Sequence, residues 1–122
     1  VLLHALTDAV CGAACLGDIG HYFPPSDDQW KDASSDKFLQ HILALAADKG
    51  WILAHADVTL IGERPRISAH RDDIRASIAS IAGIEADDIN VKATTTEKLG
   101  FAGRGEGLAA MALATMIGGS QT

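Results

Sequence analysis

The sequence predicts an α+β protein in which helices pack on one face of a mixed β-sheet. Three stretches carry hydrophobic residues at helical spacing, and two others alternate hydrophobic and polar residues as strands do. A closing apolar stretch fits either element. Helices that precede and separate the strands in this order are typical of α+β folds. The 122 residues form one domain, residues 1–122, which is long enough to bury a hydrophobic core.

Composition narrows the classes of partner. Hydrophobic residues make up 48% of the chain and charged residues 21%, which indicates a soluble globular protein. The formal net charge of -6 argues against nucleic acid or an anionic membrane as the main partner. The sequence has no apolar run of the length of a membrane span and no signal-peptide pattern.

Cys11 and Cys15 are the two cysteines of the chain. On a helix their β-carbons would lie roughly 5–6 Å apart, which is too far for a relaxed disulfide. We expect both to be small core residues. The alternative is a metal-binding pair, but no second pair completes it. A reducing compartment is consistent with this usage.

The first predicted helix spans Val1 to Leu16 and is apolar nearly all round, so we expect it to be buried. His4 and Asp8 share one of its faces, either as a structural contact or as part of a site. Asp18 follows the helix end, where the macrodipole disfavours a negative charge. It is therefore a candidate anion ligand or hydroxyl acceptor, unless it is a solvated loop carboxylate.

A polar, proline-containing stretch from His21 to Asp32 predicts a surface loop that could cover a site. Its anchors to the body of the protein would be three aromatic residues, Tyr22, Phe23 and Trp30.

The middle of the chain predicts a helix followed by a strand. Ser34 or Ser35 is expected to cap the helix, and Lys49 and Gly50 end it. Its apolar stripe comprises Phe38, Leu39, Ile42, Leu45 and Ala46. The strand spans Trp51 to Gly62. Its hydrophobic face comprises Ile52, Ala54, Ala56, Val58 and Leu60.

Ser68 is expected to cap a third helix, which ends at Gly83. The buried side of this helix comprises Ile74, Ile78 and Ile81. A second strand then runs through Ile89, Val91 and Ala93. The last stretch, Leu108 to Ile117, has helical propensity but also alternates, so the residue pattern leaves its structure open.

The stretch from Lys92 to Gly107 is the most informative one. Three threonines precede Glu97, and glycines surround Arg104. Hydroxyl and backbone donors suit a polyanionic ligand, as do a carboxylate able to hold a divalent cation and the charges of Lys92, Lys98 and Arg104. From composition alone, a strand that runs into a glycine-rich turn explains the stretch equally well.

Five motifs follow one another along the chain. They are LLHALTDA (Leu2 to Ala9), LGDIG (Leu16 to Gly20), FPPSD (Phe23 to Asp27), DVT (Asp57 to Thr59) and NVKATTTEKLGFAGRGEG (Asn90 to Gly107). Together they closely resemble the signature of the 2-C-methyl-D-erythritol 2,4-cyclodiphosphate synthase family of the non-mevalonate isoprenoid pathway. The resemblance covers essentially the whole chain.

This resemblance implies a ferredoxin-like βαβ arrangement, a long closing strand, and a homotrimer that assembles through its sheets with an active site at each subunit interface. Family members are phosphorus-oxygen lyases. They convert 4-CDP-2-C-methyl-D-erythritol 2-phosphate to 2-C-methyl-D-erythritol 2,4-cyclodiphosphate and CMP. The substrate's own 2-phosphate is the nucleophile, so the enzyme supplies positioning and electrostatic stabilisation. A bacterial cytoplasmic or a plastid stromal location is also implied.

The resemblance assigns catalytic and metal-binding roles to particular residues. His4 matches a ligand of a zinc ion (Zn²⁺), which Asp8 would support from the next turn. Glu97 matches the ligand of a second divalent cation, Mg²⁺ or Mn²⁺. Thr95 and Glu97 match catalytic positions beside the phosphates.

Substrate contacts are assigned in the same way. The residues that match the methylerythritol-binding positions are Asp18, Gly20 and Phe23. The residues that match the cytidine-binding positions are Gly62, Arg66, Ile67, Ala93, Thr94 and Thr95. Arg66 replaces the more usual lysine, so its contact is expected to differ. Arg104 matches an arginine that faces a cavity on the trimer axis, where some relatives bind isoprenoid diphosphates.

The chain departs from the family pattern at its start. Family members begin with a strand that carries Asp-x-His, which gives two further zinc ligands, and the present sequence starts after that segment. We therefore expect a truncated or partly recorded chain. A protein of these 122 residues alone would hold well under one zinc per chain. The alternatives are a catalytically impaired trimeric fragment that binds nucleotide or isoprenoid diphosphate, and a piece of a bifunctional polypeptide.

Overall fold

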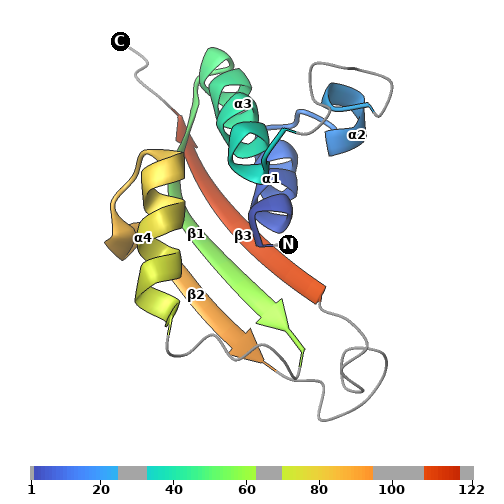
Figure 1. Ribbon diagram of the computed structural model, residues 1–122. Helices are drawn as coiled ribbons and strands as arrows, with labels where there is room; N and C mark the ends of the chain where they lie inside the picture. The colour runs from blue at the N-terminus through green and yellow to red at the C-terminus, as the bar shows by residue number, and fades with distance from the viewer. Residues whose placement is uncertain (1, 25–32, 63–69, 95–108, 119–122) are drawn as a thin grey trace.

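Three strands form one mixed sheet, and the helices lie on one of its faces (Figure 1). The structure, a computed structural model, describes residues 2–24, 33–62, 70–94 and 109–118. The strand order is β2-β1-β3. β1 (Trp51–Ile61) runs parallel to β2 (Ile89–Thr94) and antiparallel to β3 (Ala109–Gly118). The predicted α+β class is confirmed, and so is the closing strand.

β1, the helix α4 (Arg71–Ala82) and β2 form a βαβ unit. Parallel neighbours need such a crossover connection, because the chain must return to the same end of the sheet before it runs alongside again. The βαβ arrangement that the resemblance implied is therefore confirmed. A short 3-10 helix, η3 (Ala86–Asp88), joins the end of α4 to β2.

α1 (Leu2–Ala13) is shorter than predicted. It ends because Cys15 adopts a left-handed backbone conformation, with a φ of 56°. The Leu16 N–H donates to the Cys11 carbonyl at 2.8 Å, and the Cys15 N–H donates to the Gly12 carbonyl at 3.2 Å. This pair of hydrogen bonds is a Schellman motif, which closes a helix by satisfying its last carbonyls.

α1 also packs differently from the prediction. It buries one side, formed by Leu6, Thr7, Val10 and Cys11, whereas the sequence predicted burial nearly all round. Cys11 is a core residue as expected, but Cys15 is exposed. The expectation that both cysteines are core residues is wrong for Cys15, because the helix ends before it and turns its side chain outward.

α2 (Ile19–Tyr22) is a single helical turn at the start of the stretch predicted to be a loop. Two of the predicted anchors hold it. The Tyr22 hydroxyl donates to the Leu16 carbonyl at 2.6 Å, and the ring of Phe23 packs against that of Phe38 with centroids 4.6 Å apart.

α3 (Ser35–Asp48) begins after Ser34, as predicted, and Lys49 is its C-cap. It buries Leu39, Ile42 and Ala46. The last turn of α3 lies close to the end of α1, because the Lys49 Nζ donates to the carbonyls of Ala14 at 2.9 Å and Cys15 at 3.1 Å.

β1 departs from simple alternation at one point. A β-bulge between Leu53 and His55 shifts its register against β3. Because a bulge exchanges the two faces of a strand, Leu53 faces the core and Ile52 is 48% exposed. The prediction that Ile52 lies on the buried face is therefore wrong. Beyond the bulge the predicted core residues are buried, namely Ala56, Val58 and Leu60.

α4 begins at Arg71 with His70 as its N-cap. This corrects the predicted cap at Ser68, a residue outside the described part of the chain. The helix ends at Gly83, as predicted, where a φ of 74° requires the left-handed conformation that glycine adopts freely. Ile78 is its main buried residue at 3% exposure.

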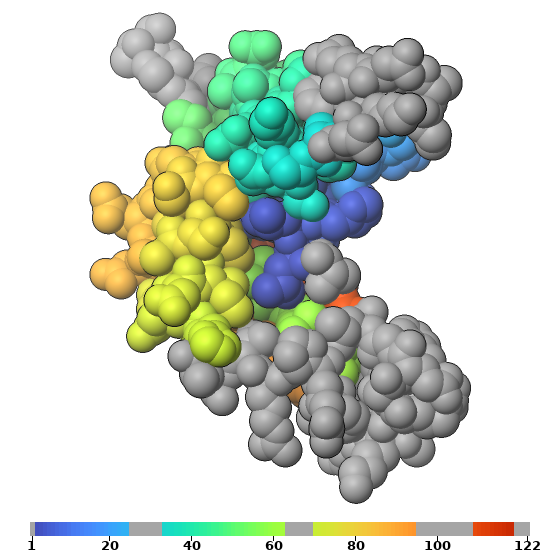
Figure 2. Space-filling view, in the orientation of Figure 1, coloured from blue at the N-terminus to red at the C-terminus, as the bar shows by residue number. Residues whose placement is uncertain are grey.

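The core lies between the sheet and the three longer helices. Figure 2 shows α1, α3 and α4 covering this face of the molecule. The largest fully buried side chains include Leu6 of α1, Leu39 and Ile42 of α3, and Ile89 of β2. In the described segments no helix is both long and apolar enough to cross a membrane.

Candidate functional site

The parallel pairing of β1 and β2 places the ends of both strands side by side. Leu60 lies opposite Ala93, and Ile61 lies opposite Thr94. The Gly62 N–H donates to the Thr94 carbonyl at 3.1 Å and continues the ladder by one bond. Gly62, Ala93 and Thr94, all predicted to hold cytidine, are thus neighbours in space. Ala93 and Thr94 are both exposed, so a ligand can reach them.

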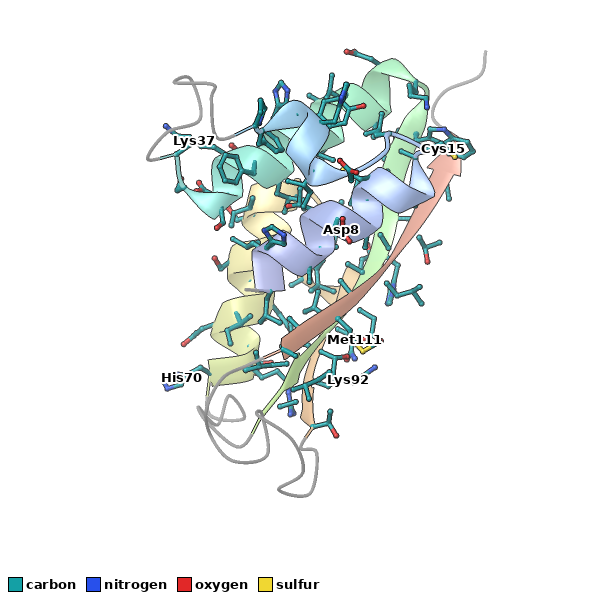
Figure 3. The ribbon with its side chains drawn as sticks, turned by 90° about the vertical axis from the view of Figure 1, so that its right-hand side faces the viewer. Asp8, Cys15, Lys37, His70, Lys92 and Met111 are labelled. Atoms are coloured by element: carbon teal, nitrogen blue, oxygen red, sulfur yellow. The ribbon has the colours of Figure 1, made fainter. Side chains whose placement is uncertain are left out.

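His4 and Asp8 are both exposed on one side of α1. They line a hollow of about 360 Å³ between α1 and the first residues of β3. Figure 3 shows Asp8 on α1. The remaining lining of this hollow is small or apolar and consists of Ala5, Ala9, Ala110, Met111 and Ala112. An imidazole and a carboxylate that open into one apolar hollow can bind a cation or a polar ligand.

This hollow does not contain a complete zinc site. Within the described residues, no group of three or more His, Cys, Asp or Glu side chains is arranged to hold a metal ion. A catalytic zinc site normally has three protein ligands. His4 and Asp8 offer two at most, so the described residues do not fit a zinc ion by themselves.

Asp18 has a clear structural role. It is the N-cap of α2, and its Oδ1 accepts a hydrogen bond from the His21 N–H at 3.2 Å. A carboxylate is favourable at a helix N-terminus, so its position breaks no local rule. Asp18 lies both after the end of α1 and at the beginning of α2, and the sequence pattern predicted only the first of these. The methylerythritol-binding role of Asp18 stays a prediction.

The other two residues predicted to bind methylerythritol lie nearby in α2 and just after it. A β-carbon added to Gly20 would meet the Asp18 Oδ1 at 3.8 Å, an ordinary contact, so packing alone does not require glycine here. The ring of Phe23 contacts the rings of Phe38 and His41, with a centroid distance of 5.6 Å to the latter. Phe23 therefore serves at least as a packing residue.

Lys92 is engaged in a contact that the sequence did not predict. Its Nζ donates to the Asp57 Oδ2 at 2.5 Å, and the Asn90 Nδ2 donates to the Asp57 Oδ1 at 2.8 Å. These hydrogen bonds, with that of Lys92 as the larger cause, hold the pKa of Asp57 below its usual value. The charge of Lys92 is paired with Asp57 in this structure, and its predicted role in binding a polyanion stays a prediction.

The remaining predicted residues lie outside the described part of the chain. They are Trp30, Arg66, Ile67, Thr95, Glu97, Lys98 and Arg104. Thr95 directly follows Thr94, the last residue of β2, in the sequence. The described part of the predicted cytidine site therefore ends at Thr94.

Comparison with solved structures places the fold among the cyclodiphosphate synthases. A structure described as IspF from Plasmodium falciparum in complex with CDP superposes with a TM-score of 0.85 at 28% identity. The match covers 98% of this chain and 72% of that one. The chain belongs to the YgbB family, whose model matches residues 1–117.

Two curated relatives show how the chain relates to longer proteins. It is 54% identical over 118 residues to the 2-C-methyl-D-erythritol 2,4-cyclodiphosphate synthase of Xanthomonas oryzae pv. oryzae. The match covers 97% of this chain and 72% of the relative. It is 61% identical over 113 residues to the bifunctional enzyme IspD/IspF of Maricaulis maris. That match covers 93% of this chain but spans only 30% of the relative's length.

Proposed function

We propose that this chain carries the cyclodiphosphate synthase activity of a phosphorus-oxygen lyase in isoprenoid biosynthesis. The substrate would be 4-CDP-2-C-methyl-D-erythritol 2-phosphate, and the products 2-C-methyl-D-erythritol 2,4-cyclodiphosphate and CMP. The observation that carries this proposal is the 54% identity over 97% of the chain to a relative with that name. The alternative, a binding fragment without catalysis, is not favoured by relatives of this kind.

The reaction is an internal transfer. An oxygen of the substrate's 2-phosphate forms a bond to the β-phosphorus, and the bond from the β-phosphorus to the oxygen bridging the two phosphates breaks. CMP leaves with that electron pair. Because the nucleophile belongs to the substrate, the protein has to bring the two ends together and stabilise charge on phosphoryl oxygens.

The proposed substrate contacts follow from the geometry of the described strands. Gly62, Ala93 and Thr94 would hold the cytidine at the ends of β1 and β2, where their backbones are neighbours. Thr95 and Glu97, the next residues along the chain, would then lie near the phosphates. Cytidine binding would also involve Arg66 and Ile67, and the methylerythritol part would contact Asp18, Gly20 and Phe23.

We also propose that the enzyme uses two divalent cations. His4 would give one ligand of a zinc ion, and Glu97 would hold Mg²⁺ or Mn²⁺. Support for His4 comes from its exposure in the hollow that it shares with Asp8. Since the described residues offer fewer than three zinc ligands, the others have to come from groups outside them.

A homotrimer is proposed as the assembled form. The face of the sheet opposite the helices carries large hydrophobic side chains that are well exposed, among them Met111 at 63% and Leu113 at 69%. Exposed apolar surface of this kind marks interaction sites. Arg104 would then face the trimer axis, where an isoprenoid diphosphate could bind. A cytoplasmic or stromal location is proposed with this assignment.

Direct assay of the purified natural protein that contains this chain tests the proposal. With substrate and Mg²⁺ or Mn²⁺, we expect CMP and the cyclodiphosphate to appear in equal amounts, measured by phosphorus NMR. The Glu97→Gln variant is expected to lose about a hundredfold or more in turnover. CMP release without the cyclic product, or no reaction at all, would contradict the proposed activity.

A further inference from the structure

Asp57 joins two strands on the face of the sheet that the helices leave open. One of its carboxylate oxygens accepts a hydrogen bond from Lys92, and the other accepts one from Asn90. Both partners belong to β2, whereas Asp57 belongs to β1. Figure 3 shows Lys92 on the same side of the sheet as Met111, away from the helices. A single carboxylate therefore holds two positions of the neighbouring strand.

This contact is specific to one register of the strands. Asp57 lies opposite Asn90, and Lys92 lies opposite Thr59. Asn90 and Lys92 are two residues apart, so both point to the open face. A shift of β2 by one residue would turn both side chains to the opposite face, where Ile89 and Val91 are now buried. The two hydrogen bonds of the Asp57 carboxylate thus stabilise the native register of β2 against β1.

A second polar contact holds β2 from its other face. The Arg75 Nε on α4 donates to the Ile89 carbonyl at 2.9 Å, and its Nη2 donates to the Ala86 carbonyl at 3.0 Å. Arg75 therefore fixes the start of β2, and Asp57 fixes its middle. Among the described strands β2 borders β1 alone, so these side chains add to a ladder that exists on one edge.

The contact lies close to the proposed nucleotide site. Thr94 is two residues beyond Lys92, which is about 7 Å along a strand. The Thr94 carbonyl accepts the hydrogen bond from the Gly62 N–H, and this bond joins the ends of β1 and β2. Any slip or fraying of β2 would move Ala93 and Thr94 away from Gly62 before it reached the buried start of the strand.

We propose that Asp57 is a positioning residue for this site, which holds β2 so that Ala93 and Thr94 stay beside Gly62. The inference rests on the proposed function, because it takes these three residues as the cytidine-binding backbone. Asp57 acts through Asn90 and Lys92 and does not touch the ligand. The carboxylate is charged at neutral pH, and its hydrogen bonds with Lys92 and Asn90 hold its pKa below the usual value.

Hydrogen exchange followed by NMR tests the hold on β2 without any ligand. The Asp57→Asn variant is expected to exchange the protected amides of β2 about tenfold faster or more. Asp48→Asn is the matched control, because it makes the same chemical change at an exposed position on α3. Equal exchange in the two variants would overturn the inference. Because Asp57 lies on the face proposed as the trimer interface, the two variants are compared at the same state of assembly, which light scattering establishes.

Titration with CDP tests the consequence for binding. At a temperature where both variants are folded, Asp57→Asn is expected to weaken CDP binding about tenfold, and Asp48→Asn to leave it unchanged. A lower unfolding midpoint with unchanged CDP affinity would show a purely structural role and overturn the inference. If the unaltered protein bound no CDP, the proposed function would fail instead.

A milder variant covers the case in which Asp57→Asn does not fold. Lys92→Met removes one of the two hydrogen bonds and leaves the bond between Asp57 and Asn90. It is expected to change β2 exchange and CDP affinity in the same direction by a smaller factor. No change in either quantity would overturn the inference.

Discussion

Among the described residues, Cys15 is the one non-glycine residue with a positive φ. Its φ of 56° lies in the left-handed region, which costs a residue with a β-carbon about 1–2 kcal/mol. Most helices that end in this way use glycine at the same position, as α4 does at Gly83. α1 therefore ends at the cost of some backbone strain.

Replacing Cys15 by glycine should relieve that strain. Because glycine also gains more freedom in the unfolded chain, we expect a net stabilisation of about 0.5–1 kcal/mol. Urea unfolding measures the change. The converse substitution, Gly83→Ala, should destabilise the protein by about 1 kcal/mol. A stabilising Gly83→Ala, or a destabilising Cys15→Gly, would argue against these backbone assignments.

Asp57 should make the stability of the protein depend on pH. Its pKa is lowered in the folded state from the ordinary value of 3.8, chiefly by Lys92. The carboxylate therefore contributes stability that is fully present above the ordinary pKa and is lost as the pH falls through the lowered one. Urea unfolding between about pH 6 and about pH 2 should show this loss, and Asp57→Asn should reduce it. An identical pH profile in the variant would contradict the assignment.

Among the elements, α1 and α3 are tied together at their C-terminal ends. Lys49 follows α3 and donates to two carbonyls at the end of α1. A positive charge is favourable at this end of a helix, because the macrodipole is negative there. This one side chain thus links two helices that are separated by the whole of α2 in the sequence.

Removal of the Lys49 ammonium group should loosen this link. We expect Lys49→Met to lower the free energy of unfolding by about 1 kcal/mol. Lys37→Met is the control, because Lys37 is exposed at the other end of α3 (Figure 3). Thermal or urea unfolding compares the two variants. Equal stability of both would show that the hydrogen bonds of Lys49 contribute nothing measurable.

The elements also show which features the sequence can predict. β1, α4 and β2 follow from hydrophobic periodicity and from Gly83, since these are local signals. The bulge at Leu53 and His55 does not, because it depends on pairing with β3, more than fifty residues further along the chain. The contact between Asp57 and Lys92 was missed for the same reason, since strand register is a tertiary property. The motif around Asn90 to Gly107 identified the family, whereas periodicity alone would have given only a strand and a turn.

In the molecule as a whole, the open face of the sheet is the surface that the proposed homotrimer would bury. Met111, Leu113 and Ile117 of β3 are all more than half exposed there, and Ile52 of β1 pairs with Ile117. The polar contact around Asp57 lies on the same face. The surface thus combines an apolar stripe with paired charges, as subunit interfaces commonly do.

Light scattering tests the proposed homotrimer. We expect three times the chain mass for the unaltered protein and dissociation for Leu113→Asp, because a charge buried in an apolar interface is costly. Lys37→Asp, on the helix side of the molecule, is the control and should remain assembled. A stable monomer for the unaltered protein would contradict the homotrimer, and an undisturbed assembly in Leu113→Asp would place the interface on another face.

The joined ends of β1 and β2 are proposed to bind the nucleotide part of the substrate. Titration of isotope-labelled protein with CDP, followed by NMR, tests it most directly. The amides of Gly62, Ala93 and Thr94 should show the largest shifts among the described residues. Another hollow of about 420 Å³ lies between α1, α4 and β1 and is lined in part by Ile74, Ser77 and Ile78. Shifts centred there, with none at the strand ends, would contradict nucleotide binding at the ends of β1 and β2.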